Sequence, residues 1–128
     1  MACRDDENGS NSTNQINGKW NYSKRIIKSG KNQSILKTEI KDECESKSFL
    51  EFTSTKLTEV DYALTNNQCQ IQYNRTYDYN IDVNNYLNFD GGSFKIASLT
   101  NSELVILFDL YDYDKDGVKD EILDYYKN

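Results

Sequence analysis

Residues 103–126 read ELVILFDLYDYDKDGVKDEILDYY, and this stretch decides the fold class. From Leu104 to Leu110 an apolar side chain stands at every second position, which is the period of a β-strand buried on one face. An Asp-rich turn ending at Asp116-Gly117 follows, and residues 118–126 then form a second apolar run. The stretch therefore predicts two antiparallel strands joined by an acidic hairpin.

The period of two continues through the rest of the chain from residue 17 onward, whereas helical spacing is weak. The expected strand faces are formed by Trp20, Tyr22 and Ile26, by Leu50 and Phe52, by Val60, Tyr62 and Leu64, by Cys69, Ile71 and Tyr73, by Tyr77, Tyr79, Ile81 and Val83, by Leu87 and Phe89, and by Phe94 and Ile96. Asp90-Gly91-Gly92 predicts a tight turn between the last two runs. About eight to ten short strands separated by regular turn signals indicate an antiparallel sandwich or barrel.

The length and composition are those of a single folded domain. A chain of 128 residues supports a modest core, because a domain of this size buries roughly two-thirds of its unfolded surface. Apolar residues make up 37% of the chain, and ten Tyr and five Phe favour folding. No apolar run approaches the ~20 residues of a membrane-spanning helix. The net charge of −6 argues against nucleic-acid binding, which requires a basic surface.

Histidine is absent, and its absence excludes several kinds of catalytic site. It removes the commonest general base, the usual Ser or Cys triad and every His-ligated zinc site. The sequence also contains no Gly-rich phosphate loop, no nucleophile beside a base and no carboxylate pair marked out as acid and nucleophile. We therefore expect a binding protein rather than an enzyme.

The net charge is concentrated in two short segments. Residues 1–16 contain one basic and three acidic residues, whereas residues 17–108 contain 11 of each and are neutral. Residues 109–124 contain seven acidic and two basic residues, and Lys127 brings the total to −6. Specific chemistry is therefore expected in the N-terminal segment and in the acidic hairpin.

The N-terminal segment resembles the start of a bacterial lipoprotein. Residues 4–17 are polar with one aliphatic residue, so they predict a disordered spacer. Met1-Ala2-Cys3 precedes this spacer, and a small residue before a Cys is typical of the mature start, with Met1 as an expression start and Cys3 as the acylated residue. The run from Cys3 to Glu7 further resembles the surface-export signal of Bacteroidota lipoproteins. The alternative is a stray Cys on a polar tail.

Cys44 and Cys69 remain as one pair once Cys3 is set aside. A disulfide between them would close a loop of about 25 residues and stabilise the fold by roughly 3 kcal/mol in the chain-entropy model. Such a bond forms in an oxidising compartment, which agrees with a location in the cell envelope. The alternative is two buried free thiols.

An ordered set of motifs is similar to the lipocalin-like domain of small Bacteroidota lipoproteins. The motifs are Gly18-Lys19-Trp20, Asp42-Glu43-Cys44, Phe49-Leu50-Glu51-Phe52, Cys69 and residues 96–105. The resemblance covers residues 17–128 and implies an up-and-down β-barrel of about eight strands in which the two Cys are bonded. The Arg that lipocalins carry near the carboxyl terminus has no counterpart, because the last Arg is Arg75.

The barrel interior is either filled by its own side chains or holds one small ligand, since eight strands enclose just enough space for either. A ligand would be a small apolar or aromatic molecule. The candidate inward side chains are those of Trp20, Tyr22, Phe52, Tyr62, Tyr73, Tyr79, Leu87, Phe94, Ile106 and Phe108. Their bulk and the short strands that the chain length allows favour a filled barrel over a pocket.

The ten Tyr offer a competing interpretation, because an exposed Tyr presents an apolar face with a polar tip that suits a sugar ring. The candidates for a glycan-binding surface are Tyr77, Tyr79, Tyr111, Tyr113, Tyr125 and Tyr126. The simpler interpretation is that Tyr favours strands and covers sheet faces.

Asp112-x-Asp114-x-Asp116-Gly117-x-x-Asp120 is the most specific local pattern in the chain. Carboxylates at alternate positions suit calcium, because oxygen ligands converge on one hard cation while Gly permits a sharp turn. Leu123 stands where an EF-hand has its closing Glu, so Glu121 or the Val118 carbonyl would have to complete the shell. An ordinary hairpin turn explains the same residues without a cation.

We therefore expect an all-β, antiparallel, lipocalin-like barrel at residues 17–128 behind a spacer at residues 1–16. We expect a monomer that is held by its lipid in the outer membrane of a bacterial cell envelope and is exposed at the surface. Its partner is expected to be a small apolar ligand or a glycan, with calcium as the one candidate cofactor.

Overall fold

The computed structural model describes residues 15–128, and nearly all of its regular structure is β-strand. The strands are β1 (Gly18–Lys28), β2 (Ile35–Ile40), β3 (Phe49–Phe52), β4 (Lys56–Thr65), β5 (Gln68–Ile81), β6 (Tyr86–Phe89), β7 (Gly92–Leu99), β8 (Glu103–Tyr111) and β9 (Asp120–Lys127). A short 3-10 helix, η1 (Glu45–Lys47), precedes β3. Among the described residues, no helix has the length and apolar character needed to cross a lipid bilayer.

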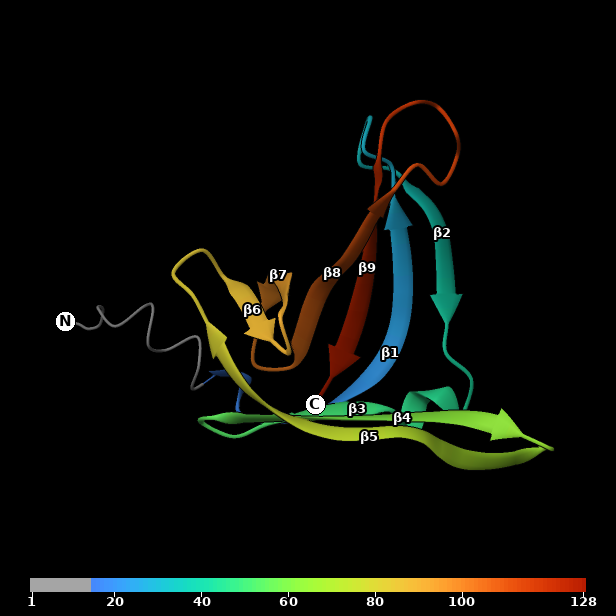
Figure 1. Ribbon diagram of the computed structural model, residues 1–128. Helices are drawn as coiled ribbons and strands as arrows, with labels where there is room; N and C mark the ends of the chain where they lie inside the picture. Colours follow the sequence, from blue (N-terminus) through green and yellow to red (C-terminus); the bar gives the residue numbers. More distant parts are fainter. Residues whose placement is uncertain (1–14) are drawn as a thin grey trace.

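The strands close into a ring in which every pair is antiparallel. From β3 to β9 each strand pairs with the next one along the chain, and β9 pairs with β1. The second edge of β1 is shared, because its first residues pair with β3 and its last residues pair with β2. β1 and β3–β9 therefore form a closed barrel of eight strands, and β2 extends the sheet beside β1 (Figure 1). The predicted antiparallel barrel of about eight strands is confirmed.

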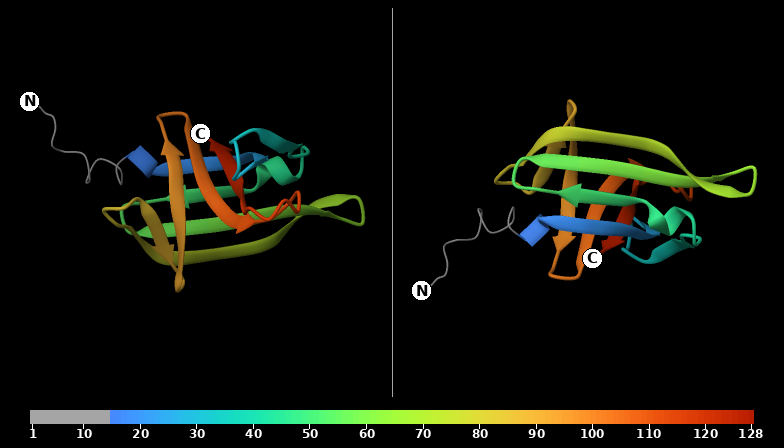
Figure 2. Two further views of the ribbon diagram at one scale, coloured as in Figure 1. Left: turned by 90° about the horizontal axis from the view of Figure 1, so that it is seen from above. Right: turned by 90° about the horizontal axis from the view of Figure 1, so that it is seen from below.

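Strands on different sides of the barrel cross at a steep angle. Figure 2 shows β7 and β8 crossing steeply over β4 and β5.

The turn between β6 and β7 is the predicted one, with Phe89 paired to Gly92 and positive φ at both Asp90 and Gly91. Positive φ at both central residues matches the twist of a two-residue hairpin.

The β4–β5 hairpin projects beyond the rest of the barrel (Figure 2). Its tip is a two-residue turn at Asn66 and Asn67, both of which have positive φ. A disulfide joins Cys69, near this tip, to Cys44, just before η1, with a Cα to Cα distance of 5.5 Å. The predicted bond is therefore confirmed, and the alternative of two free thiols is wrong. The bond ties the projecting hairpin to the segment between β2 and β3.

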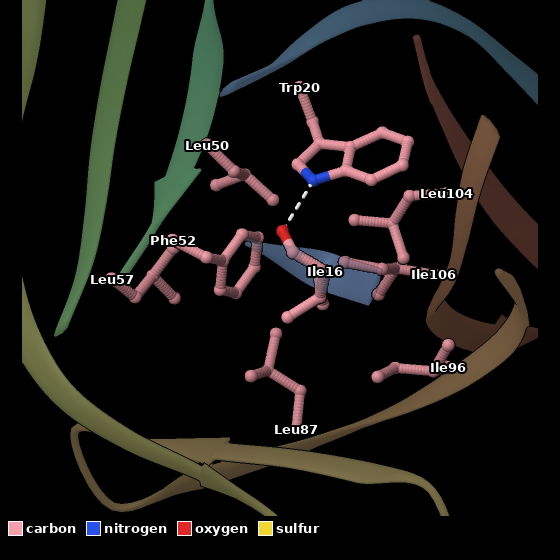
Figure 3. Close-up of a cluster of buried hydrophobic side chains, with 9 residues drawn as sticks. All are labelled: Ile16, Trp20, Leu50, Phe52, Leu57, Leu87, Ile96, Leu104 and Ile106. Atoms are coloured by element: carbon pink, nitrogen blue, oxygen red, sulfur yellow. Dashed lines mark hydrogen bonds between the residues drawn. The ribbon is translucent and has the colours of Figure 1, made fainter. Parts of the chain in front are cut away.

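A compact apolar core closes one end of the barrel around Trp20 (Figure 3). The core residues are Ile16, Trp20, Leu50, Phe52, Leu57, Leu87, Ile96, Leu104 and Ile106. The indole Nε1 of Trp20 donates a hydrogen bond of 2.7 Å to the carbonyl oxygen of Ile16. Ile16 lies within the range expected to be a spacer, yet it is fully buried and completes the core. Cys3 and the rest of the expected spacer up to residue 14 lie outside the described residues.

A bulge in β1 changes which of its side chains face the interior. The register between β1 and β9 shifts between Tyr22 and Lys24, where one extra residue is inserted. Tyr22 and Arg25 consequently both face inward, although residues three apart on a regular strand face opposite sides. Ile26, expected on the same face as Tyr22, pairs instead with Leu123 on the outer face. That expectation was wrong because alternation alone does not reveal a bulge.

Two loops dock on each other at the opposite end of the barrel from the Trp20 core (Figure 1). The Gly30 N–H donates to Asp120 Oδ1 at 2.9 Å, and the Tyr113 N–H donates to Asp120 Oδ2 at 2.8 Å. Position 30 requires glycine, because a Cβ there would lie 1.8 Å from the carbonyl oxygen of Lys119. The fully buried Asp120 therefore links the β1–β2 loop to the acidic hairpin.

Candidate functional site

A cavity of about 220 Å³ lies inside the barrel, next to the closed core. It is lined by Tyr22, Arg25, Ser48, Phe49, Leu50, Leu57, Glu59, Asp61, Leu87, Phe89, Phe94, Ile106, Phe108, Asp124 and Tyr126. Phe108 is 48% exposed and Asp61 is also exposed, so these residues mark the side on which the cavity meets solvent. The interior is therefore filled at one end and hollow beyond it, which combines the two alternatives left open by the sequence.

The floor of the cavity is apolar. Leu50, Leu57, Leu87 and Ile106 belong both to the closed core and to the cavity lining, so they are held by tight packing beneath it. Aromatic walls rise from this floor, with the ring centres of Phe89 and Phe94 5.7 Å apart and those of Tyr22 and Tyr126 5.2 Å apart. Removing apolar surface from water is the main source of affinity for small ligands in such a site.

One wall carries a partly buried ion pair that follows from strand register. Arg25 on β1 and Asp124 on β9 are directly paired positions. The Arg25 Nε donates to Asp124 Oδ1 at 2.7 Å, and its Nη2 donates to Oδ2 at 3.0 Å. The Tyr22 hydroxyl donates to the same Oδ1 at 2.7 Å. This three-residue group uses both carboxylate oxygens, and burial with the Asp124 contact raises the pKa of the Tyr22 hydroxyl far above its usual range.

The facing wall, on β4, carries two further carboxylates. Glu59 and Asp61 follow Leu57 at alternate positions, so all three side chains face the interior. Within the described part of the chain, neither carboxylate forms an ion pair or a side-chain hydrogen bond. Partial removal from water raises the pKa of half-buried Glu59 and of Asp61 at the cavity mouth, and the charge of Asp61 raises that of Glu59 further.

The sequence of residues 16–106 matches the family model described as a lipocalin-like domain. The chain belongs to this family. No curated protein matches the lipocalin-like chain over its sequence. Three solved structures have a similar chain trace at low identity: odorant binding protein OBP1, the bovine lipocalin allergen Bos d 2, and aphrodisin, a sex pheromone from female hamster.

The similarity to these structures is wide but loose. OBP1 is 11% identical with a TM-score of 0.47, and the match covers 91% of this chain and 73% of that one. The bovine allergen is 12% identical with a TM-score of 0.47, covering 91% and 74% of the two chains. Aphrodisin is 13% identical with a TM-score of 0.43, covering 88% and 74%.

The lipocalin-like barrel brings together only part of the residue set predicted for a ligand. Tyr22, Phe94 and Phe108 line the cavity, Trp20, Phe52 and Tyr79 lie in or against the closed core, and Tyr62 and Tyr73 lie outside both groups. Leu87 and Ile106, also expected inward, contribute to both core and cavity. Tyr62 and Tyr73 were expected to face the interior because their strands alternate regularly. The sequence does not show that part of the β4–β5 hairpin projects beyond the barrel, where no interior is enclosed.

Four charged residues of the cavity were missed by the sequence reasoning. They are Arg25, Glu59, Asp61 and Asp124. Glu59 and Asp61 stand at alternate positions after the inward Leu57, so the period of two could have placed them inside the barrel. Two carboxylates at alternate positions are, however, equally typical of a strand face exposed to solvent. Arg25 gave no such signal, because its inward direction depends on the bulge after Tyr22.

The six Tyr considered for a glycan surface do not share one exposed face. Tyr111 and Tyr113 are exposed, at 55% and 40%. Tyr77 is buried, whereas Tyr126 lines the cavity and stacks on Tyr22. Tyr79 and Tyr125 are half-buried. The pattern agrees better with Tyr as a strand residue than with a continuous sugar-binding platform.

The acidic hairpin folds three of its four predicted ligands towards one point. Oxygens of Asp112, Asp114 and Asp116 lie within 4.8 Å of one another. Asp112 also accepts hydrogen bonds from the backbone N–H groups of Asp116, at 3.1 Å, and Gly117, at 2.9 Å. Asp120 does not join this group, since its oxygens accept the loop N–H groups described above. The turn is therefore closed by the protein's own donors.

Proposed function

We propose that the protein is a lipoprotein of the bacterial cell envelope whose barrel binds one small, largely apolar molecule. The observation that carries the proposal is the cavity of about 220 Å³ with an apolar floor inside a lipocalin-like barrel. Barrels of eight strands hold one small ligand when side chains do not fill them. The proposed activity is non-catalytic and depends on the shape and chemistry of the cavity.

The cavity volume limits the size of the ligand. A dry cavity of about 150 Å³ is enough to hold benzene, whereas drug-sized ligands occupy pockets of roughly 300–1,000 Å³. A volume of about 220 Å³ therefore suits one aromatic ring with a short substituent. The aromatic walls at Phe89, Phe94 and Tyr126 favour such a ring through offset and edge contacts.

The binding proposal is tested by titrating indole and benzyl alcohol into the protein while ligand NMR signals are recorded. Saturable binding at one site is expected. Ile106→Phe would place extra volume in the cavity and weaken binding, whereas Leu107→Phe, one position along on the outer face, would leave it unchanged. Absence of saturable binding to the wild type, or equal effects of the two variants, would contradict the proposal.

The lipid anchor rests on Cys3 and the polar segment behind it, which lie outside the described residues. Metabolic labelling with a fatty-acid analogue, in cells that make the protein behind a lipoprotein signal peptide, tests the anchor. Wild type should carry the label and partition with the outer-membrane fraction, whereas Cys3→Ser should be unlabelled and soluble. Protease added to intact cells would then distinguish surface exposure from an inward orientation.

Calcium binding at the acidic hairpin is a second candidate function, favoured by the convergence of Asp112, Asp114 and Asp116. Partial desolvation and the charges of Asp116 and Asp120 raise the pKa of the exposed Asp114, and a bound cation would relieve the repulsion between these carboxylates. Calorimetric titration with calcium should give a weak heat that disappears in Asp114→Asn. A melting temperature and heat signal unaffected by 5 mM calcium, a level suited to roughly millimolar extracellular sites, would exclude the site.

A further inference from the structure

The two polar walls of the cavity differ in whether their charged groups already have a partner within the protein. On the β1–β9 wall, Arg25 and Asp124 neutralise each other through two hydrogen bonds, and the Arg25 guanidinium also lies 4.5 Å from the ring centre of Phe108. A fork-to-fork pair of this kind satisfies both partners. This wall therefore presents little uncompensated charge, and Arg25 is a poor site for a second anion.

Within residues 15–128, the β4 wall presents negative charge without an ion-pair partner. Arg75 is the residue directly opposite Glu59 on β5, but its guanidinium lies 5.2 Å from the ring centre of Tyr77 and makes no ion pair within residues 15–128. Asp61 faces Tyr73 across the same pair of strands. The other polar groups of the lining are the Arg25–Asp124 pair, the phenols of Tyr22 and Tyr126, and Ser48, whose hydroxyl accepts the Tyr62 N–H.

The charge of the cavity as a whole has the same sign. Among the described residues that line it, the ionisable carboxylates are Glu59, Asp61 and Asp124 and the one cation is Arg25, so these residues carry +1 − 3 = −2 when all are ionised. The floor beneath these groups is apolar, and Phe108 stands at the rim. An apolar body would bury against the floor while a positive group would lie beside the β4 carboxylates and aromatic faces.

We propose that the cavity selects a small aromatic or aliphatic molecule that carries a protonated amine, with Glu59 and Asp61 as the groups that receive the amine. This inference rests on the ligand-binding function proposed above and adds the chemical class of the ligand. An anionic ligand is disfavoured, since it would meet two uncompensated carboxylates. A neutral ligand gains the apolar contacts but leaves both carboxylates without a partner.

The test compares benzylamine, benzyl alcohol and benzoate, which share one ring and differ in charge. Isothermal titration at pH 7.5 should give benzylamine about tenfold tighter binding than benzyl alcohol, as expected for a charge-assisted hydrogen bond, and no measurable binding of benzoate. In Glu59→Gln/Asp61→Asn the preference for benzylamine over benzyl alcohol should disappear. Glu51→Gln, an exposed carboxylate on the neighbouring β3, is the matched control and should retain the preference.

A second readout follows from protonation of the two carboxylates. Lowering the pH through the raised pKa values of Glu59 and Asp61 should weaken the binding of benzylamine and leave the binding of benzyl alcohol unchanged. This pH dependence should vanish in the double variant. Equal affinity for benzylamine and benzyl alcohol, or tighter binding of benzoate, would overturn the amine preference while leaving the ligand-binding function intact. Failure of all three compounds to bind would instead overturn the ligand-binding function on which the inference rests.

Discussion

The two ends of the barrel interior are built from different chemistry. The nine described core residues around Trp20 are apolar except for the indole N–H, which donates to the Ile16 carbonyl at 2.7 Å. Around Arg25 the interior holds an ion pair, two further carboxylates and a cavity of about 220 Å³. Both ends are lined by the same strands, so the difference comes from side-chain choice and from one bulge in β1.

The Trp20 end favours folding, whereas the Arg25 end leaves charged groups with which a ligand could pair. The Trp20 end buries apolar surface without cost to polar groups, which is the dominant favourable term in folding. The Arg25 end removes charged groups from water, which reduces stability unless each group finds a partner. Glu59 and Asp61 lack a protein partner among the described residues, so this end is where a ligand contributes most. Mutations at the two ends should therefore have separable effects.

The largest effect is expected at the closed end, from Trp20→Ala. Trp20 is fully buried, so truncation removes its packing and leaves a cavity, a change that typically lowers the free energy of unfolding by about 3–5 kcal/mol. Because Trp20 is the chain's one tryptophan, urea unfolding should be followed by circular dichroism. Trp20→Phe keeps much of the packing and should lose clearly less. An equal loss in both variants would show that the Ile16 hydrogen bond, rather than packing, dominates this end.

Breaking the ion pair at the cavity end is expected to have the next largest effect. Arg25→Met leaves Asp124, whose side chain is 7% exposed, as an uncompensated buried charge, and should lower the free energy of unfolding by about 3 kcal/mol. Arg25→Met/Asp124→Leu removes both charges and should recover most of this loss. A double variant as unstable as the single one would mean that the pair stabilises the barrel outright, and the contrast between the two ends would weaken.

The strand pattern and the closed end were largely predictable from the sequence. Alternating apolar residues located the strands, Asp90-Gly91-Gly92 located a turn, and Trp20 and Phe52 were correctly expected inside, because burial of every second side chain leaves a direct trace in the sequence. Ile16 was not expected in the core, since one aliphatic residue in a polar run carries no period.

The cavity end was much less predictable, for two physical reasons. A bulge inserts one residue and inverts the alternation beyond it, so the inward direction of Arg25 is a property of the β1–β9 pairing rather than of β1 alone. The closeness of Arg25 to Asp124 likewise depends on the register between strands 99 residues apart in the chain. The empty volume depends on how the steeply crossing strands pack, which no local pattern encodes.

Removal of the disulfide tests whether the carboxylate wall depends on the projecting hairpin. Cys44→Ala/Cys69→Ala should lower the free energy of unfolding by about 2–3 kcal/mol, since the bond closes a loop of sequence separation 25. Hydrogen exchange should increase first in the outer part of β4 and β5, beyond Asp61, while protection near Trp20 persists. Uniform loss of protection would show that the bond stabilises the whole barrel and not this wall in particular.

The smallest effect is expected from Glu59→Gln, and its sign is diagnostic of the cavity end. The pKa of Glu59 is raised by burial and by Asp61, so the folded protein holds this proton more tightly than the unfolded chain does. Stability contributed by the protonated form is present below the usual Glu range and is lost as pH rises through the raised folded-state pKa. At neutral pH the ionised group is therefore unfavourable, and Glu59→Gln should raise the melting temperature slightly while Glu51→Gln does not.

A saturating amine should reverse the order of the two melting temperatures and make wild type more stable than Glu59→Gln. The reason is that the amine gives the Glu59 carboxylate a partner in wild type, whereas the variant has no carboxylate at this position. A melting temperature that falls in ligand-free Glu59→Gln would mean that Glu59 already has a stabilising partner, and the cavity would then lack the uncompensated charge that distinguishes it from the Trp20 end.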